Sequence, residues 1–163
     1  MQHYAILLPR LMDLWLVRHG EAVSATVDLA RPLSAEGERA VSAVALSLAG
    51  EMGRFDLVAA SRRRRARQTA EILVAASGYL PDRIEETEAL SPDAPPERFL
   101  AFLEENRDKE RVLCVGHLPS IARIGSFLLS RYKPVDLAFH PASVCRIRLS
   151  SICPGGGELV FFR

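Results

Sequence analysis

The chain has 163 residues, of which 48% are apolar and 25% are charged, and its formal net charge is +1. This composition is that of an ordinary globular domain, and it excludes an intrinsically disordered chain or a membrane-embedded one. A nearly neutral protein has no overall field that attracts a polyanion, so any preference for anions must arise locally.

The cysteines and the first residues bear on the cellular compartment and on domain organisation. Cys114, Cys145 and Cys153 form no closely spaced pair, and two of them lie in apolar runs. Such free thiols indicate a reducing compartment, so we expect a cytoplasmic protein. The opening MQHYAILLPR is a poor signal peptide and far too short to span a membrane. We expect residues 1–12 to be an N-terminal extension and residues 13–163 to form a single domain.

Short apolar runs alternate with helical patterns along the first half of the chain. Residues 14–17 (LWLV) and 55–60 (FDLVAA) are typical of buried strands. The segment 34–48 carries apolar residues at helical spacing behind a capping serine, with Gly50 near its end. A second amphipathic helix is predicted over residues 66–77, so the pattern is strand, helix, strand, helix.

The alternation continues in the second half. A weak strand is expected near Ile84, and RVLCVG (111–116) gives the clearest strand signal of the chain. Prolines suited to a first helical turn predict helices that begin near Pro95 and Pro119. These βα repeats predict an α/β layered sandwich with a largely parallel sheet.

The tail departs from this alternation. Two strands, 143–149 and 158–162, are joined by a PGGG turn and are expected to add at least one antiparallel strand. In open α/β sheets, ligands bind beyond the carboxyl ends of the strands, where the strand order reverses. The residues at those ends are therefore the candidates for a functional site.

Three predicted strands end in residues suited to phosphate chemistry. The first is followed by Arg18 and His19, the second by Ser61 and an arginine-rich turn, and the 111–116 strand by His117. Neutral imidazole is a nucleophile that accepts phosphoryl groups, and the arginine fork matches phosphate oxygens. Positive neighbours lower the pKa of a histidine and so keep it unprotonated. The sequence thus predicts a phosphoryl-transfer site with two histidines and two arginines.

These residues belong to motifs of a known family. LVRHGEA, with the downstream RPLSAEG, SRRRRARQTAE and VLCVGHLPS, resembles the histidine phosphatase superfamily, whose fold is phosphoglycerate mutase-like. The similarity runs from about Asp13 to Leu149, and the small SixA-type phosphohistidine phosphatases are the most similar branch. The resemblance implies a three-layer α/β/α sandwich with a mostly parallel central sheet.

The resemblance also implies roles for single residues. The family's nucleophile falls on His19, which would become a covalent phosphohistidine, and its partner arginine falls on Arg18. The second phosphate-binding arginine precedes A-x-Q-T and is therefore Arg65, and the second histidine of the pocket falls on His117. The family's usual acid finds no clear counterpart, and Glu88, one position away from the expected place, is only a weak candidate.

The substrate predicted from these features is a phosphohistidine displayed on a partner protein, as in a phosphorelay. Short connections indicate an open site, and an imidazole leaving group needs less protonation than an alkoxide. A phosphatase or mutase acting on small phosphate monoesters is the alternative. No cofactor is implied, and without CxxC, HxxxH or HExxH spacing we expect no metal site.

Two arginine features allow other interpretations. The run Arg62 to Arg65 resembles a basic patch, but a nearly neutral chain without interleaved aromatics is a poor candidate for nucleic-acid binding. A non-catalytic module that binds phospho-ligands or nucleic acid is thus a distant alternative. Arg31 of RPLS lies either at the rim of the pocket or in a purely structural loop position, and we favour the structural role.

Overall fold

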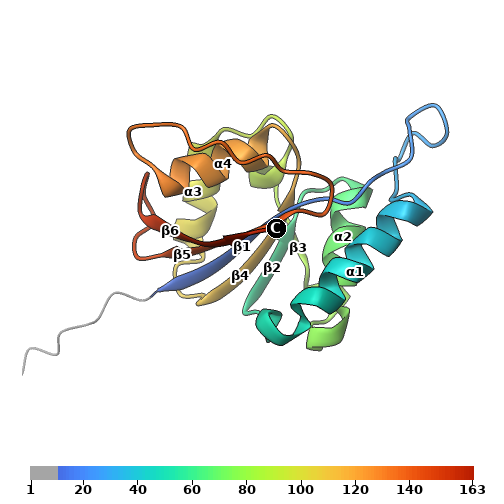
Figure 1. The fold of residues 1–163 in the computed structure, drawn as a ribbon, viewed down its shortest axis with the longest axis horizontal. Coiled ribbons are helices and arrows are strands. Elements are labelled where there is room, and N and C mark those ends of the chain that lie inside the picture. The colour runs from blue at the N-terminus through green and yellow to red at the C-terminus, as the bar shows by residue number, and fades with distance from the viewer. Residues whose placement is uncertain (1–10) are drawn as a thin grey trace, which may run out of the picture.

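The computed structural model describes residues 11–163, which form a six-stranded mixed sheet between two pairs of helices (Figure 1). The strands are β1 Met12–Arg18, β2 Leu57–Ala60, β3 Glu85–Glu86, β4 Arg111–Gly116, β5 Val144–Leu149 and β6 Gly157–Phe162. The α-helices are α1 Ala35–Met52, α2 Arg64–Val74, α3 Pro96–Glu105 and α4 Ser120–Leu129, with short 3-10 turns at Ala75–Ser77, Pro81–Arg83 and Glu88–Leu90.

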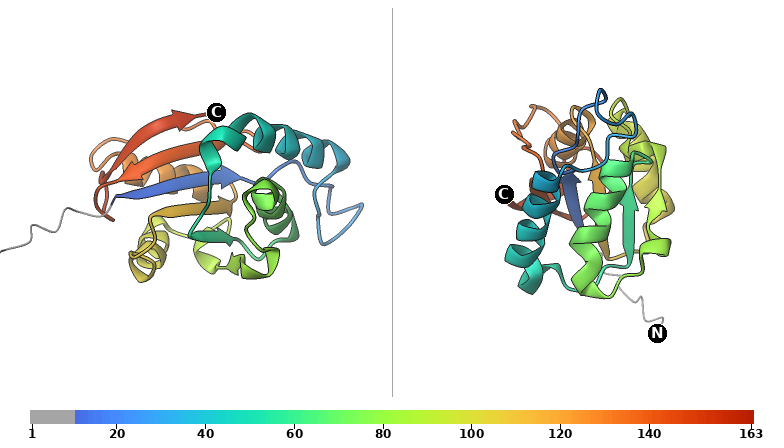
Figure 2. Two further views of the ribbon diagram at one scale, coloured as in Figure 1. Left: turned by 90° about the horizontal axis from the view of Figure 1, so that it is seen from below. Right: turned by 90° about the vertical axis from the view of Figure 1, so that its right-hand side faces the viewer.

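The sheet has the order β3-β2-β4-β1-β5-β6. β1 pairs in parallel with β4, which pairs in parallel with β2, and β2 does so with β3. β5 is antiparallel to both β1 and β6, so it alone opposes the direction of the other five strands. Helices α1 and α2 cover one face and α3 and α4 the other, as two further views show (Figure 2). The predicted α/β/α sandwich with a mostly parallel sheet and an antiparallel tail is confirmed.

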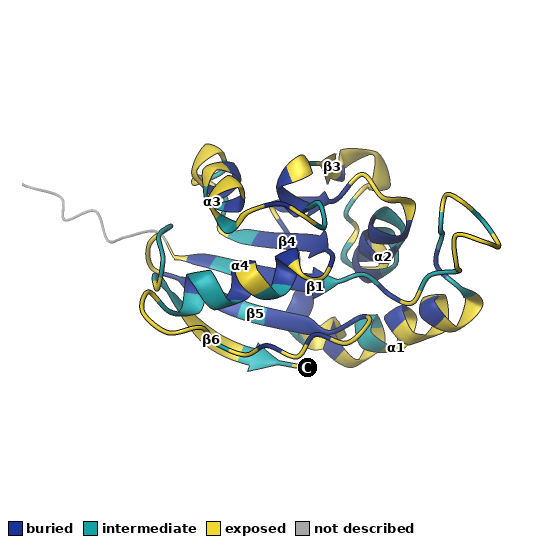
Figure 3. Cartoon of the chain, turned by 90° about the horizontal axis from the view of Figure 1, so that it is seen from above, coloured by how far each residue is buried: buried dark blue, intermediate teal, exposed yellow. Residues whose placement is uncertain are grey.

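The central strand β1 is buried from both sides. Because successive strand residues point to opposite faces, Leu14 and Leu16 pack in the core beneath α3 and α4. Trp15 and Val17 pack in the second core, beneath α1 and α2. Figure 3 shows the central strands buried and the outer sides of the helices exposed. The residues that follow β1 therefore project from a rigid platform.

The first helix extends further than its sequence pattern predicts. We expected it to end near Gly50, but it continues to Met52 and is capped by Gly53 at φ 52°. The apolar face continues through Leu48 and Met52, both buried, which outweighs the cost of one glycine inside the helix. Arg111 donates to the carbonyl of Met52 at 2.6 Å and satisfies part of the helix end.

Other elements differ in extent from their predictions. The weak strand near Ile84 is the two-residue β3, and the second strand begins at Leu57 rather than at residue 55. Met12, assigned by the sequence to the extension, is the first residue of β1 and is buried. Leu11 is exposed, and residues 1–10 of the predicted extension lie outside the described residues.

Two further features of the described residues concern the cysteines and the helices. Cys114 and Cys145 are buried free thiols, and burial raises the pKa of Cys145 to about 12.

No helix within residues 11–163 is long and apolar enough to cross a membrane.

Candidate active site

The carboxyl ends of three parallel strands bring the predicted site residues together. The amide of His19, after β1, donates to the carbonyl of Gly116 at 3.1 Å, and the amide of Ser61, after β2, donates to Val115 at 3.1 Å. These bonds continue the parallel ladder past the last paired residues. The rings of His19 and His117 lie with their centroids 4.7 Å apart. The expected convergence of the two imidazoles is therefore present.

His19 is held as a neutral imidazole with one ring nitrogen available. Its Nδ1 lies 2.6 Å from the carbonyl oxygen of Gly20, and because a carbonyl only accepts, Nδ1 carries the proton. Nε2 therefore keeps its lone pair and accepts a hydrogen bond from Arg65 Nε at 3.2 Å. Burial, together with the charges of Arg65 and Arg18, lowers the pKa of His19 to about 4, although the Gly20 bond opposes this.

Gly20 allows the nucleophile loop to lie against α1. A Cβ atom at this position would come within 2.6 Å of Val41 Cγ2 and 3.2 Å of the carbonyl oxygen of Gly37. Any larger residue would push the loop away from the helix. The RHG motif thus combines two reactive side chains with the close approach that fixes them.

The two arginines are positioned by different elements. Arg18 ends β1, and its Nη1 donates to the carbonyl of Phe139 at 2.8 Å. Its Nε is buried and has no partner within residues 11–163. Arg65 lies in the first turn of α2 with 9% of its surface exposed. Burial, then the charges of Arg31 and Arg63, lower the pKa of Arg65, although it stays protonated at any physiological pH.

Thr69 joins the nucleophile loop to the helix that carries Arg65. The fully buried hydroxyl accepts from the amide of Gly20 at 3.0 Å and donates to the carbonyl of Arg65 at 2.7 Å. The residue before Thr69 makes a second such contact, because Gln68 Oε1 accepts from the amide of Leu33 at 2.8 Å. Both residues belong to the ARQT motif, but the sequence alone could not predict which groups they bind, because their partners lie 35 and 49 positions away.

His117 is the more deeply buried of the two histidines. It is 2% exposed, and its Nε2 lies 2.7 Å from Ser61 Oγ, which accepts from the amide of Arg63 at 3.2 Å. Its Nδ1 is buried and has no partner within the described part of the chain. Burial, then the charges of His19 and nearby arginines, lower its pKa to about 3. His117 is therefore neutral at pH 7.

Glu88 is not arranged as a proton donor. It lies in the turn Glu88–Leu90, where it accepts from Ser91 Oγ at 2.6 Å and pairs with Arg62 Nε at 3.3 Å. The Ser91 bond, then the Arg62 charge, lower the pKa of this exposed carboxyl. A general acid at neutral pH needs the opposite shift. No hydrogen bond within residues 11–163 joins Glu88 to His19 or His117, so nothing in this arrangement favours Glu88 as the acid.

Arg31 has both of the roles that the sequence suggested, one at the rim of the site and one in its loop. Its Nε donates to the carbonyl of Val23 at 3.3 Å, which closes the loop before α1. Its charge also lowers the pKa of His19 and His117. Arg31 therefore adds positive charge at the rim of the site as well as holding its loop.

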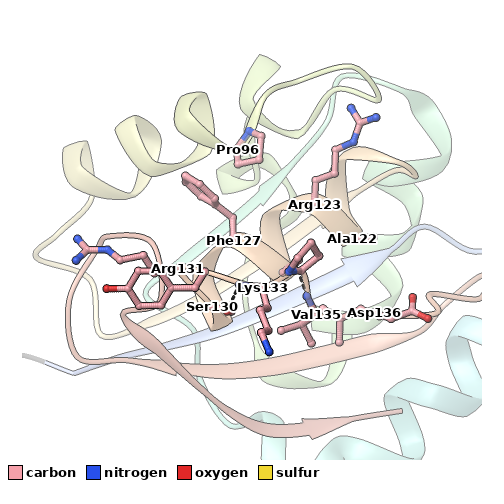
Figure 4. A pocket seen from close by; sticks show the side chains of 13 residues that line it. Pro96, Ala122, Arg123, Phe127, Ser130, Arg131, Lys133, Val135 and Asp136 are labelled. Carbon is pink, nitrogen blue, oxygen red and sulfur yellow. Dashed lines mark hydrogen bonds between the residues drawn. The ribbon is translucent and has the colours of Figure 1, made fainter.

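Two hollows of the surface bear on the site. One, of about 430 Å³, lies next to Arg65 and is lined by Leu29, Ala30, Arg31, Arg62, Arg63, Arg64 and Arg65. The other, of about 520 Å³, runs along α4 and includes none of the predicted site residues (Figure 4). Within residues 11–163, no group of three or more histidine, cysteine or carboxylate side chains has the geometry of a metal site.

Comparison with known proteins identifies the family. A family model for the histidine phosphatase superfamily (branch 1) matches residues 14–91. An uncharacterized protein of Picosynechococcus sp. strain PCC 7002 is 36% identical over 115 residues, which are 68% of this chain and 68% of that protein. This chain belongs to the histidine phosphatase superfamily.

Similarity to solved structures indicates the branch of the superfamily to which this histidine phosphatase belongs. The protein histidine phosphatase SixA, complexed with tungstate, is 26% identical and superposes with a TM-score of 0.79 over 93% of this chain and 96% of SixA. The α-ribazole phosphatase of Shigella flexneri, at 21% identity and a TM-score of 0.68 over 91% and 94% of the two chains, shares the fold. The chain is thus a phosphatase, a hydrolase, of the SixA-type branch.

Proposed function

We propose that this histidine phosphatase removes the phosphoryl group from phosphohistidine on a partner protein, through a covalent phosphohistidine at His19. The observation that carries the proposal is the neutral His19 ring, whose Nε2 lone pair faces the guanidinium of Arg65 beside His117. A nucleophile that is unprotonated at neutral pH and flanked by fixed positive charge is what phosphoryl transfer requires.

In the first step, Nε2 of His19 attacks phosphorus. The new Nε2–P bond forms as the P–N bond to the substrate imidazole breaks, and the departing imidazole takes a proton from solvent. For this step Arg65 exchanges its bond to Nε2 for bonds to the phosphoryl oxygens, joined by Arg18. The proton stays on Nδ1, hydrogen-bonded to the Gly20 carbonyl, throughout, so the ring keeps its orientation.

In the second step, water attacks phosphorus and the Nε2–P bond breaks. Inorganic phosphate leaves with the proton lost by the water, and neutral His19 is regenerated. We assign His117 a role in both steps. Ser61 Oγ accepts the Arg63 amide, and we assign its own proton to the bond with Nε2 of His117, which leaves the proton of the neutral ring on Nδ1. That buried, unpartnered Nδ1–H is available to donate to a phosphoryl oxygen.

Two features favour a phosphohistidine substrate over an alcohol ester. Glu88, the sequence candidate for an acid, is held as a carboxylate by Ser91 and Arg62, and imidazole departs with little help from an acid. The protein histidine phosphatase SixA also superposes better than the α-ribazole phosphatase of S. flexneri, 0.79 against 0.68 in TM-score. Both features favour a partner protein as the natural substrate.

The test is a comparison of substrates with the intact chain and its His19→Ala variant. A phosphohistidine protein and a panel of phosphate monoesters are supplied in turn, with and without a chelator. We expect rapid phosphate release from the phosphohistidine protein, no effect of the chelator, and loss of turnover in His19→Ala. An acid-labile, alkali-stable phosphoenzyme is expected in the native protein alone.

Each part of the proposal has a result that overturns it. Turnover of esters alone reassigns the substrate to small phosphate monoesters. Loss of activity on chelation contradicts metal-independent catalysis. An unchanged rate in His19→Ala refutes the nucleophile.

A further inference from the structure

The hollow of about 430 Å³ next to Arg65 combines four further arginines with a catalytic arginine. We propose that it is a second anion-binding subsite, which takes a carboxylate or phosphate carried by the substrate next to its transferable phosphoryl group. The inference rests on the proposed function only in placing that phosphoryl group at His19. It assigns a role to Arg31, Arg63 and Arg64, which the mechanism leaves unused.

The arginines of this hollow have almost no carboxylate to neutralise them. Arg62 pairs with Glu88 at 3.3 Å, but that pair is exposed, with 67% and 53% of the side chains accessible. Within residues 11–163, Arg31, Arg63 and Arg64 form no ion pair. Several guanidinium groups that converge without counter-charge repel one another, and binding an anion relieves that repulsion.

The position of the arginine cluster also disfavours the start of helix α2. Arg63 is the N-cap of α2 and Arg64 its first residue, and no side chain caps this end or places an acid in the first turn. The positive end of the helix dipole disfavours cations there, by a few tenths of a kcal/mol each. Residues that break a local rule without a structural gain are typical of functional sites.

The hollow adjoins the phosphoryl site through one shared residue. Arg65 lines the hollow, and its Nε contacts His19 Nε2 at 3.2 Å. The charges of Arg31 and Arg63 are felt at His117, whose pKa both of them lower. The groups next to the phosphoryl group of a substrate bound at His19 would therefore lie near the arginines.

The rim of the hollow indicates where the second anion comes from. Leu29 lines the hollow and is 89% exposed, and Val27 of the same loop is 77% exposed. The loop before α1 projects from the end of the molecule at which α1 and α2 begin (Figure 1). Apolar side chains beside arginines suit a protein surface with an acidic residue near its phosphohistidine better than a free bisphosphate.

The experiment compares R63Q/R64Q with a matched double variant, R123Q/R131Q. The control removes the same charge from exposed arginines on the hollow along α4, where Figure 4 shows them on opposite sides. The substrates are two phosphohistidine peptides that differ only in flanking aspartates or asparagines, and two phosphate monoesters that differ only in a second phosphate. The readouts are kcat/KM and Tm.

For the native protein we expect kcat/KM to be about fivefold to tenfold higher with the aspartate peptide than with the asparagine peptide. R63Q/R64Q is expected to remove this preference, chiefly by lowering kcat/KM for the aspartate peptide, and to keep or raise Tm. R123Q/R131Q should keep the preference. A bisphosphate preference that R63Q/R64Q removes, without an aspartate preference, supports the subsite with a small-molecule source.

Equal turnover of both members of each pair overturns the subsite. If neither peptide is hydrolysed, the proposed protein substrate fails, and the ester pair still decides for or against the subsite. Salt-sensitive binding of single-stranded RNA that R63Q/R64Q weakens, with both substrate pairs turned over equally, reassigns the arginines to nucleic acid and also overturns it.

Discussion

Two groups of arginines, near opposite ends of the central strands, have opposite electrostatic surroundings. Near the amino ends of β1 and β4, Arg146 binds Asp13 through two bonds of 2.8 and 3.1 Å and stacks 4.9 Å from the Trp15 ring. Arg111 approaches the same carboxylate at 3.5 Å. At the carboxyl ends, Arg65 contacts the neutral His19 and no carboxylate within the described residues.

The difference separates arginines that stabilise the fold from arginines that remain available to a ligand. A guanidinium that is fully hydrogen-bonded to a carboxylate contributes to the fold and offers little to a passing anion. A buried guanidinium without such a partner costs stability, and a bound phosphoryl group supplies the missing charge. Three sets of substitutions and one pH titration test this division and the site that depends on it.

The largest effects, on kcat/KM and on stability, are expected from replacing one arginine of each group by glutamine. R65Q should reduce kcat/KM by about a hundredfold or more, since it removes a fixed positive charge from the transferring oxygens. R146Q should leave kcat/KM within about twofold and lower the free energy of unfolding by roughly 1–3 kcal/mol. Steady-state kinetics and urea unfolding measure both. The division fails if R65Q costs stability and R146Q costs activity.

The second largest effect is expected from removing the Asp13 carboxylate, which neutralises Arg146 and Arg111. D13N leaves Arg146 and Arg111 without their counter-charge in a site where Asp13 is 17% and Arg146 18% exposed. We expect a loss of about 2 kcal/mol in the free energy of unfolding, with normal kcat/KM. The control E36Q opens the exposed pair with Arg39 and should cost less than about 0.5 kcal/mol. Equal losses would contradict the importance of burial.

A smaller effect on stability, with a measurable effect on rate, is expected for Thr69. T69V leaves the buried amide of Gly20 without an acceptor, which costs roughly 1–2 kcal/mol. Because that amide adjoins His19, kcat should fall by about tenfold while KM changes little. T69S keeps the hydroxyl and should restore kcat. A T69S variant as slow as T69V would show that the methyl group, and not the hydrogen bond, positions the loop.

The smallest change is expected on lowering the pH. The pKa of His19 is lowered to about 4 and that of His117 to about 3, so kcat/KM should vary less than about twofold between pH 8 and pH 5. In the unfolded chain both rings take up protons near pH 6.5, so the stability due to their burial is complete above 6.5 and is lost as the pH falls toward 4. Imidazole ¹⁵N shifts that titrate near 6.5 in the folded protein would refute the lowered values.

The sequence predicts the fold and the identity of the converging residues better than it predicts the contacts between them. Apolar runs and capping residues determine the strands and helices locally, and RHG, ARQT and GH mark the strand ends. Parallel strands then bring His19 and His117 to one edge, whatever the details of packing.

The contacts that orient those residues could not be read in the same way. Ser61 and His117 are 56 positions apart, and Gly20 and Thr69 are 49 apart, so neither bond has a local signal. The end of α1 was misjudged for a related reason, because tertiary burial of Met52 overrides the glycine before it. The pairing of Glu88 with Arg62 likewise depends on two turns that only the folded chain brings together.

The order of the strands has a consequence for how the chain matures on the ribosome. β1, which carries Arg18, lies between β4 and β5, and its residues pair with Arg111–Gly116 and Val144–Leu149. Both neighbours are translated long after β1. The backbone N–H and C=O groups of β1 therefore have no strand to pair with while most of the chain is synthesised. A nascent chain released before residue 144 would lack one flank of β1, and its reactive histidine would be left on an incomplete edge.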